Sequence, residues 1–129
     1  MIKSILEFLF SRDIQYFDES HISDAKKSYW TAKSYEFLSY SNNSVYTYSY
    51  LINTTQLQNT QRNAIWNYLN AAIKGHIEAQ YKLGMIYLTG ELGADRNYRY
   101  ADQWLLKAKQ HGHKGAAEAL SHAYSQLAI

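Results

Sequence analysis

The segment AIWNYLNAAIKGHIEAQYKLGMIY, residues 64–87, decides the fold, because its pattern returns in residues 101–124 as ADQWLLKAKQHGHKGAAEALSHAY. Six positions coincide at a spacing of 37 residues. They are Ala64, Ala71, Gly75, Ala79, Leu83 and Tyr87 in the first copy, and Ala101, Ala108, Gly112, Ala116, Leu120 and Tyr124 in the second. A recurrence of this length is typical of supersecondary units that stack on one another.

Each copy predicts two antiparallel helices joined by a glycine turn. Glycine supplies the left-handed backbone that a tight turn requires, so one helix is expected to end at Gly75 and another at Gly112. Thr60 and Asn97 are the expected N-caps of the first helix in each copy. Gly84 is expected to let a neighbouring backbone approach closely. The four helices are predicted over residues 61–74, 77–89, 98–111 and 114–127.

The chain that precedes these copies is expected to add further helices. Apolar spacing predicts a short amphipathic helix over 2–10 and a helix over 24–40 with Asp24 as its N-cap. Residues 45–50 alternate as a strand does, but a lone strand has no partner in a helical chain, so a helix is predicted there too. Residues 53–59 are predicted to form a polar loop.

Composition predicts one globular domain over residues 1–129, since 129 residues with 47% apolar content can bury a core of ordinary size. The formal net charge of +2 falls short of the clustered excess of a nucleic-acid binder, so no nucleic-acid partner is expected. Cysteine is absent, which excludes disulfides, thiolate metal ligands and a cysteine nucleophile. Proline is absent as well, so nothing prevents helix over most of the chain.

The two copies resemble the Sel-one-like repeat, a helix-turn-helix module of the tetratricopeptide-like class. The resemblance rests on the alanines and glycines at fixed spacing, together with Trp104. It implies an all-α fold, an α-solenoid of antiparallel helix hairpins, with two repeats over 60–129 and an N-terminal extension over 1–59 that holds at most a degenerate repeat. It also implies a surface that binds other proteins and no enzymatic chemistry. The chain departs from the family pattern at Asn67, where Trp is usual, and at Ser121, where Gly is usual.

Histidines around the second glycine turn suggest a metal site, because His111, His113 and His122 are close in sequence. Zinc requires three or four convergent ligands, however, and two imidazoles that flank a turn are expected to diverge. Solvent-exposed histidines are therefore the favoured interpretation. Hydrolase motifs and phosphate-binding motifs are absent. No catalytic residue, cofactor or metal ion is expected.

The predicted partner-binding surface is a stripe on the first helix of each copy. Subtracting the core positions leaves a set with the same spacing in both copies: Arg62, Trp66, Asn70 and Ile73, followed by Arg99, Gln103, Lys107 and Gln110. A Trp and an Ile on one stripe form a candidate hot spot for a protein interface. The alternative is that Trp66 and Ile73 are buried against the N-terminal helices.

The favoured function is a non-catalytic protein-interaction module, an adaptor or scaffold that binds a protein partner. One alternative is a dedicated inhibitor or immunity-type protein with a single effector as its partner. A metal-dependent hydrolase that uses the three histidines is the least favoured. The apolar run of the first ten residues is too short to span a bilayer and a poor signal peptide, so a cytoplasmic monomer with no membrane span is expected.

Overall fold

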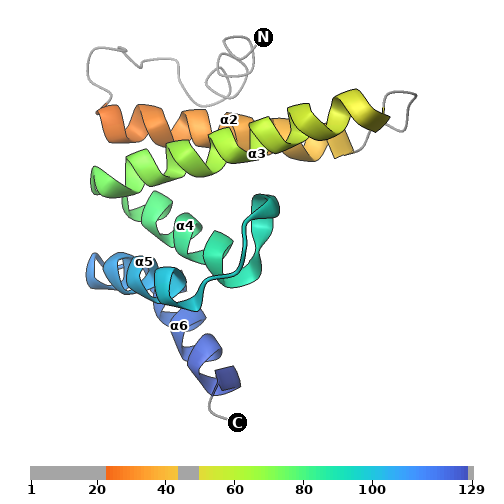
Figure 1. Ribbon diagram of the computed structural model, residues 1–129. Coiled ribbons are helices and arrows are strands. Elements are labelled where there is room, and N and C mark those ends of the chain that lie inside the picture. Colours follow the sequence, from red (N-terminus) through yellow and green to blue (C-terminus); the bar gives the residue numbers. More distant parts are fainter. Residues whose placement is uncertain (1–22, 44–49, 128–129) are drawn as a thin grey trace.

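The computed structural model describes residues 23–43 and 50–127, and every regular element within them is helical (Figure 1). The elements are α2 (Asp24–Asn43), α3 (Tyr50–Ile73), α4 (Ile77–Thr89), the 3-10 turn η2 (Glu91–Gly93), α5 (Tyr98–Gln110) and α6 (Lys114–Leu127). The predicted all-α class is therefore confirmed for this part of the chain. The helix predicted over 2–10, and residues 44–49 of the strand-like segment, lie outside the described residues.

Each helix packs mainly against its neighbours in sequence. α2 lies along α3, α3 packs on α4, α4 packs on α5, and α5 packs on α6. Figure 1 shows this succession, with the long pair of α2 and α3 at one end and α6 at the other. The helices predicted over 77–89, 98–111 and 114–127 agree with α4, α5 and α6 to within one residue.

The first half of α3 corrects the prediction of a loop over 53–59. The helix begins at Tyr50 and continues to Ile73 without a break. Thr60 is therefore not an N-cap, because it lies inside the helix and its hydroxyl donates to the carbonyl oxygen of Gln56 at 2.7 Å. This segment contains no glycine or proline that would interrupt a helix, and the threonine hydroxyl finds its acceptor one turn earlier.

The N-cap of α2 lies one residue earlier than predicted. The hydroxyl of Ser23 accepts the backbone N–H of Lys26 at 3.3 Å. Asp24 instead occupies the first turn, where its negative charge interacts favourably with the helix dipole. Ser23 rather than Asp24 therefore caps this helix.

The two predicted glycine turns share one geometry. Gly75 and Gly112 both have φ of 91°. The N–H of each glycine bonds to the carbonyl oxygen three residues back, at 3.0 and 2.9 Å, and the next N–H bonds to the carbonyl oxygen five residues back, at 3.0 and 2.9 Å. This Schellman arrangement satisfies carbonyl groups that the helix end leaves unpaired. The recurrence in the sequence is therefore also a recurrence of local structure.

Small side chains line the contacts between helices. Gly84 on α4 faces Leu105 on α5, and a Cβ built on the glycine would lie 2.6 Å from Cγ of that leucine. The two helices therefore approach closely because position 84 has no side chain, as predicted. The main core cluster comprises Ala32, Ala64, Tyr68, Ala71, Ala72, Ala79, Leu83, Ile86 and Leu92. A second cluster comprises Leu105, Ala108, Ala116 and Leu120.

A largely buried group of charged and polar side chains joins α2, α3, α4 and η2. Nζ of Lys82 lies 2.7 Å from Oε1 of Glu36 and 3.0 Å from Oε2 of Glu91. The hydroxyl of Tyr68 donates to the other carboxylate oxygen of Glu36. Burial alone would lower the pKa of Lys82, but the hydrogen bonds to Glu36 and Glu91 and the attraction of their charges together outweigh this effect and raise the pKa. The lysine therefore remains charged inside the fold.

Replacing Lys82 with Met should lower the free energy of unfolding by about 2–4 kcal/mol, because the nearly buried carboxylate of Glu36 loses its cation. The double variant Glu36→Gln with Lys82→Met should recover part of this loss, since the only carboxylate then left without its cation is that of Glu91, whose side chain is 35% exposed. Urea unfolding followed by circular dichroism measures both values. A double variant that is no more stable than Lys82→Met would contradict the explanation.

The close approach of α4 and α5 predicts a position-specific effect of valine. Gly84→Val should lower the free energy of unfolding by about 2 kcal/mol or more, because the branched side chain would overlap Leu105. Ser121 occupies the same position 37 residues later and is exposed. Ser121→Val is therefore the matched control and should change stability by less than about 0.5 kcal/mol in the same unfolding assay. Equal effects of the two substitutions would contradict this packing.

Candidate functional site

The outward face of α3 carries the predicted hydrophobic stripe. Trp66 is 60% exposed and Ile73 is 67% exposed, so neither side chain is buried. They are seven residues apart, which places them on one face of the helix. Arg62 is exposed one turn before Trp66, and Asn70 is half-buried between Trp66 and Ile73. We call these four residues the α3 stripe.

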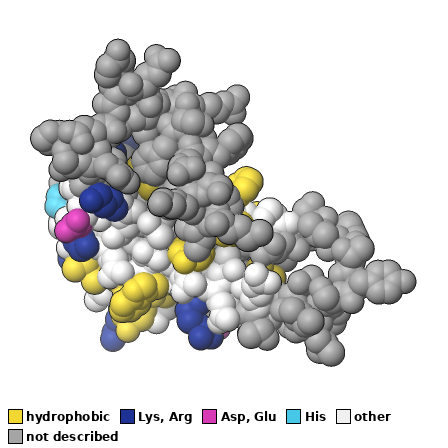
Figure 2. Space-filling model, turned by 90° about the horizontal axis from the view of Figure 1, so that it is seen from above, with side chains coloured by type: hydrophobic (Ala, Val, Ile, Leu, Met, Phe, Trp, Pro, Cys, Tyr) yellow, Lys and Arg dark blue, Asp and Glu magenta, His cyan; other side chains and the backbone are white. Residues whose placement is uncertain are grey.

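The opposite face of α3 holds the stripe in place. Ala64, Tyr68, Ala71 and Ala72 on that face are buried in the main core cluster. The hydroxyl of Tyr68 is also fixed by its hydrogen bond to Glu36 on α2. The exposed residues of α3 therefore stand on a well-packed support. The space-filling view shows exposed hydrophobic side chains beside lysine and arginine side chains (Figure 2).

The corresponding residues on α5 form a polar stripe. Arg99, Gln103 and Lys107 are all exposed. Nζ of Lys107 lies 5.2 Å from the centre of the half-buried Trp104 ring, within the range of a cation–π interaction. α3 and α5 are not among the closely packed helix pairs, and α4 lies between them (Figure 1). The structure thus places the predicted residues on two stripes, one with an apolar centre and one polar.

Two histidines 37 residues apart form the same helix cap. Nδ1 of His76 accepts the backbone N–H three residues later at 3.2 Å, at the start of α4. Nδ1 of His113 accepts the equivalent N–H at 3.1 Å, at the start of α6. Each imidazole also stacks on a tyrosine of a preceding helix, His76 on Tyr29 with ring centres 4.3 Å apart and His113 on Tyr81 at 4.1 Å. These histidines therefore cap and pack the helices.

The prediction of solvent-exposed histidines is wrong for His113. Its side chain is 17% exposed, and Nε2 lies 2.9 Å from Oε2 of Glu78. Because Nδ1 accepts a hydrogen bond, the proton lies on Nε2, which donates to the carboxylate. His111 is exposed, as predicted. Its Nδ1 lies 2.9 Å from Oε1 of Gln80. The sequence analysis missed these caps because Ser, Thr, Asp and Asn are the usual capping residues. The signal that could have revealed them is a histidine directly after each turn glycine.

The environment of His76 favours the neutral imidazole. Burial lowers the pKa of His76 below its usual value of 6.5, the nearby carboxylate of Glu78 opposes this effect, and Lys26 adds to it. Protonation would also remove the acceptor at Nδ1 that caps α4. The folded state therefore favours the neutral form of His76 over the protonated form.

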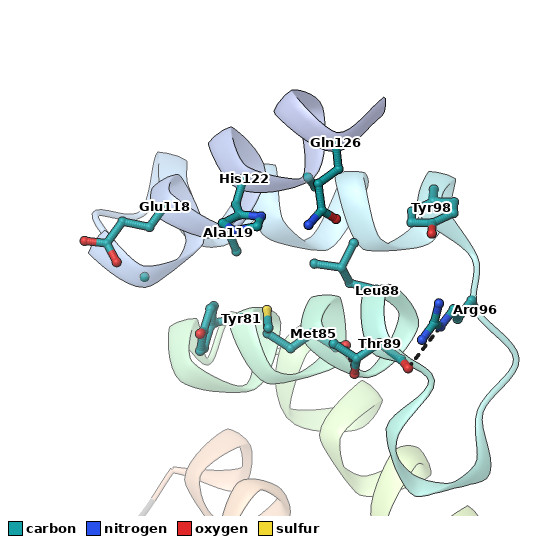
Figure 3. A pocket seen from close by; sticks show the side chains of 12 residues that line it. Tyr81, Met85, Leu88, Thr89, Arg96, Tyr98, Glu118, Ala119, His122 and Gln126 are labelled. Carbon is teal, nitrogen blue, oxygen red and sulfur yellow. Dashed lines mark hydrogen bonds between the residues drawn. The ribbon is translucent and has the colours of Figure 1, made fainter. Parts of the chain in front are cut away.

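A groove of about 710 Å³ runs between α4 and α6 (Figure 3). Its floor includes Met85 and Leu88 from α4 and Ala119 from α6, which pack against the second core cluster. Figure 3 shows Glu118 at one end of the groove and Arg96 at the other. The sequence did not single out any of these residues, because the groove forms only when two helices from different copies lie side by side.

Among residues 23–43 and 50–127, no three side chains of His, Cys, Asp or Glu converge in a group that could hold a metal ion. Within the same ranges, no helix has the length and apolar character to cross a membrane. Comparisons of the chain with protein-family models, curated proteins and solved structures found no match. A functional proposal therefore rests on the residues of this chain.

The His76 cap predicts a loss of stability in mild acid. As the pH falls below about 6.5, His76 gains a proton more readily in the unfolded chain than in the fold, so protonation favours unfolding. His76→Asn keeps a capping side chain that does not titrate there. The stability of the wild type relative to this variant should therefore fall between about pH 7 and pH 5, as measured by urea unfolding. If the wild type and His76→Asn lost the same unfolding free energy between pH 7 and pH 5, His76 would not be the titrating group.

Proposed function

We propose that this chain is a non-catalytic module that binds another protein through the α3 stripe. The observation that carries the proposal is the exposure of Trp66 and Ile73 on the same face of one helix. Large exposed apolar side chains that lie together are typical of protein-binding surfaces. Trp is also among the residues most often found at the energetic centre of an interface.

We also propose that the helices form two repeats of the Sel-one-like class, arranged as an α-solenoid. Support comes from local structure that recurs after 37 residues: the glycine turn and the histidine cap each occur twice. Both capping histidines also stack on a tyrosine, although these tyrosines, Tyr29 and Tyr81, do not follow the 37-residue spacing. In a solenoid of this kind, the first helices of successive repeats line the same side. The polar stripe on α5 would then extend the surface that begins with the α3 stripe.

The two stripes would contribute to binding in different ways. Burial of Trp66 and Ile73 against a partner removes apolar surface from water, which supplies most of the favourable free energy. Arg62 and Arg99 carry guanidinium groups that donate directional hydrogen bonds to carboxylates. Such charges at the rim of an interface favour one partner over others more than they raise affinity.

Trp66→Ala should weaken partner capture by about tenfold or more while it lowers the free energy of unfolding by less than about 1 kcal/mol. The measurement is an affinity pulldown with the tagged full chain from the cells that express it, quantified by mass spectrometry. Phe37→Ala is the matched control, because Phe37 is an aromatic residue of similar exposure, 55%, on α2 rather than α3. This control should capture the same partners as the wild type.

A Trp66→Ala variant that loses much stability but retains its partners would overturn the proposal, and so would equal losses from Trp66→Ala and Phe37→Ala. The pulldown also separates the two binding functions considered from the sequence. Several partners of moderate affinity support an adaptor. A single tight partner supports a dedicated inhibitor that uses the same stripe.

A further inference from the structure

Apolar side chains line the middle of the groove between α4 and α6, His122 and Gln126 also line it, and charged side chains lie at its ends (Figure 3). Met85, Leu88 and Ala119 are partly buried residues of its lining, so their remaining apolar surface faces the groove. Glu118 and Arg96 lie at opposite ends, as Figure 3 shows. A volume of about 710 Å³ is within the range of protein sites that hold small ligands or short peptide segments.

A smaller cavity of about 270 Å³ adjoins the groove at its Arg96 end. The two spaces share Leu88, Tyr98 and Ala123 as lining residues. Leu105 and Leu120 of the second core cluster form the apolar part of the small cavity, and Arg99, Asp102 and Tyr124 also line it. Its position suits one apolar side chain of a molecule that lies in the groove.

The charged groups at the two ends are available to a ligand. Nε of Arg96 donates to the carbonyl oxygen of Thr89 at 3.1 Å, which orients the guanidinium group and leaves its other N–H groups for a further acceptor. Glu118 is exposed. Within the part of the chain that the structure describes, neither Arg96 nor Glu118 forms an ion pair. One end of the groove therefore favours an anion and the other a cation.

We propose that this groove binds an extended segment of a protein partner in which a basic and an acidic side chain flank apolar residues. The basic side chain pairs with Glu118, and the acidic side chain pairs with Arg96. The apolar residues between them cover Met85, Leu88 and Ala119. The site uses no residue of the α3 stripe. A negative result for the groove therefore does not contradict the function proposed for that stripe, and the reverse also holds.

The length of the groove sets the spacing of the two charges. From Tyr81 to Thr89, the α4 residues that line it, the helix rises by about 12 Å. An extended chain advances about 3.3 Å per residue, so the distance corresponds to about four residue steps. In an extended pentapeptide the side chains at positions 1, 3 and 5 share one face, so charges at the first and last positions and a leucine at the third fit this distance.

The test titrates the isotope-labelled full chain with the blocked pentapeptide acetyl-Lys-Ala-Leu-Ala-Glu-amide and follows chemical shifts by NMR. The wild type should show saturable shifts at Met85, Leu88 and Ala119. Acetyl-Lys-Ala-Leu-Ala-Lys-amide should bind about tenfold more weakly, because its last charge is repelled by Arg96. Replacing the leucine of the first peptide with serine should abolish binding, because the apolar contact is lost.

Charge reversal in the protein should reverse the peptide preference. Arg96→Glu should weaken binding of the peptide that ends in Glu by about tenfold and strengthen binding of the peptide that ends in Lys. Glu118→Lys, at the other end, should correspondingly favour acetyl-Glu-Ala-Leu-Ala-Glu-amide. Lys33→Glu reverses an exposed charge on α2, outside the groove, and should leave all affinities within about twofold. The amide spectrum of each variant reports whether it is folded.

Three outcomes would overturn the proposal. The first is a wild type that binds none of these peptides, or that binds the Glu-ended and Lys-ended peptides equally well. The second is shifts that cluster away from α4 and α6. The third is a pair of folded variants, Arg96→Glu and Glu118→Lys, with unchanged peptide preference.

Discussion

The charged end of Lys82, held between Glu36 and Glu91, is the contact on which most of the arrangement depends. It ties α2 to α4 and to the loop after α4, and Tyr68 adds α3 through the second oxygen of Glu36. Burial and this hydrogen bond raise the pKa of Tyr68, so the hydroxyl keeps its proton and remains a donor. Because the partners come from four different elements, only one relative placement of those elements satisfies them all.

Local chemistry explains how much of the fold could be predicted from the sequence. Gly75 and Gly112 form their turns with carbonyl groups of the preceding helix turn, and Asn97 caps α5 through an N–H three residues later. These elements therefore follow from short stretches of sequence. The polar residues between 53 and 59 resemble a loop in composition, yet they are helical because α3 packs along α2 over much of its length. A tertiary contact of that kind has no local signature.

The candidate surfaces also include features that a local sequence pattern predicts and features that depend on tertiary contacts. Helical periodicity placed Trp66 and Ile73 off the core stripe, and both are exposed. The stack of His113 on Tyr81 and its bond to Glu78 join residues more than thirty positions apart in the chain. The groove likewise requires Arg96 and Glu118 to come from separate elements. Sequence spacing could not reveal these contacts, because they depend on how closely α4 and α6 lie.

The packing of each helix against its sequence neighbours also has a kinetic consequence. Three residues separate α3 from α4, and three separate α5 from α6, so little chain entropy is lost when each hairpin closes. Low contact order of this kind is associated with fast folding. Folding can therefore begin at either of these short turns and spread to the neighbouring helices.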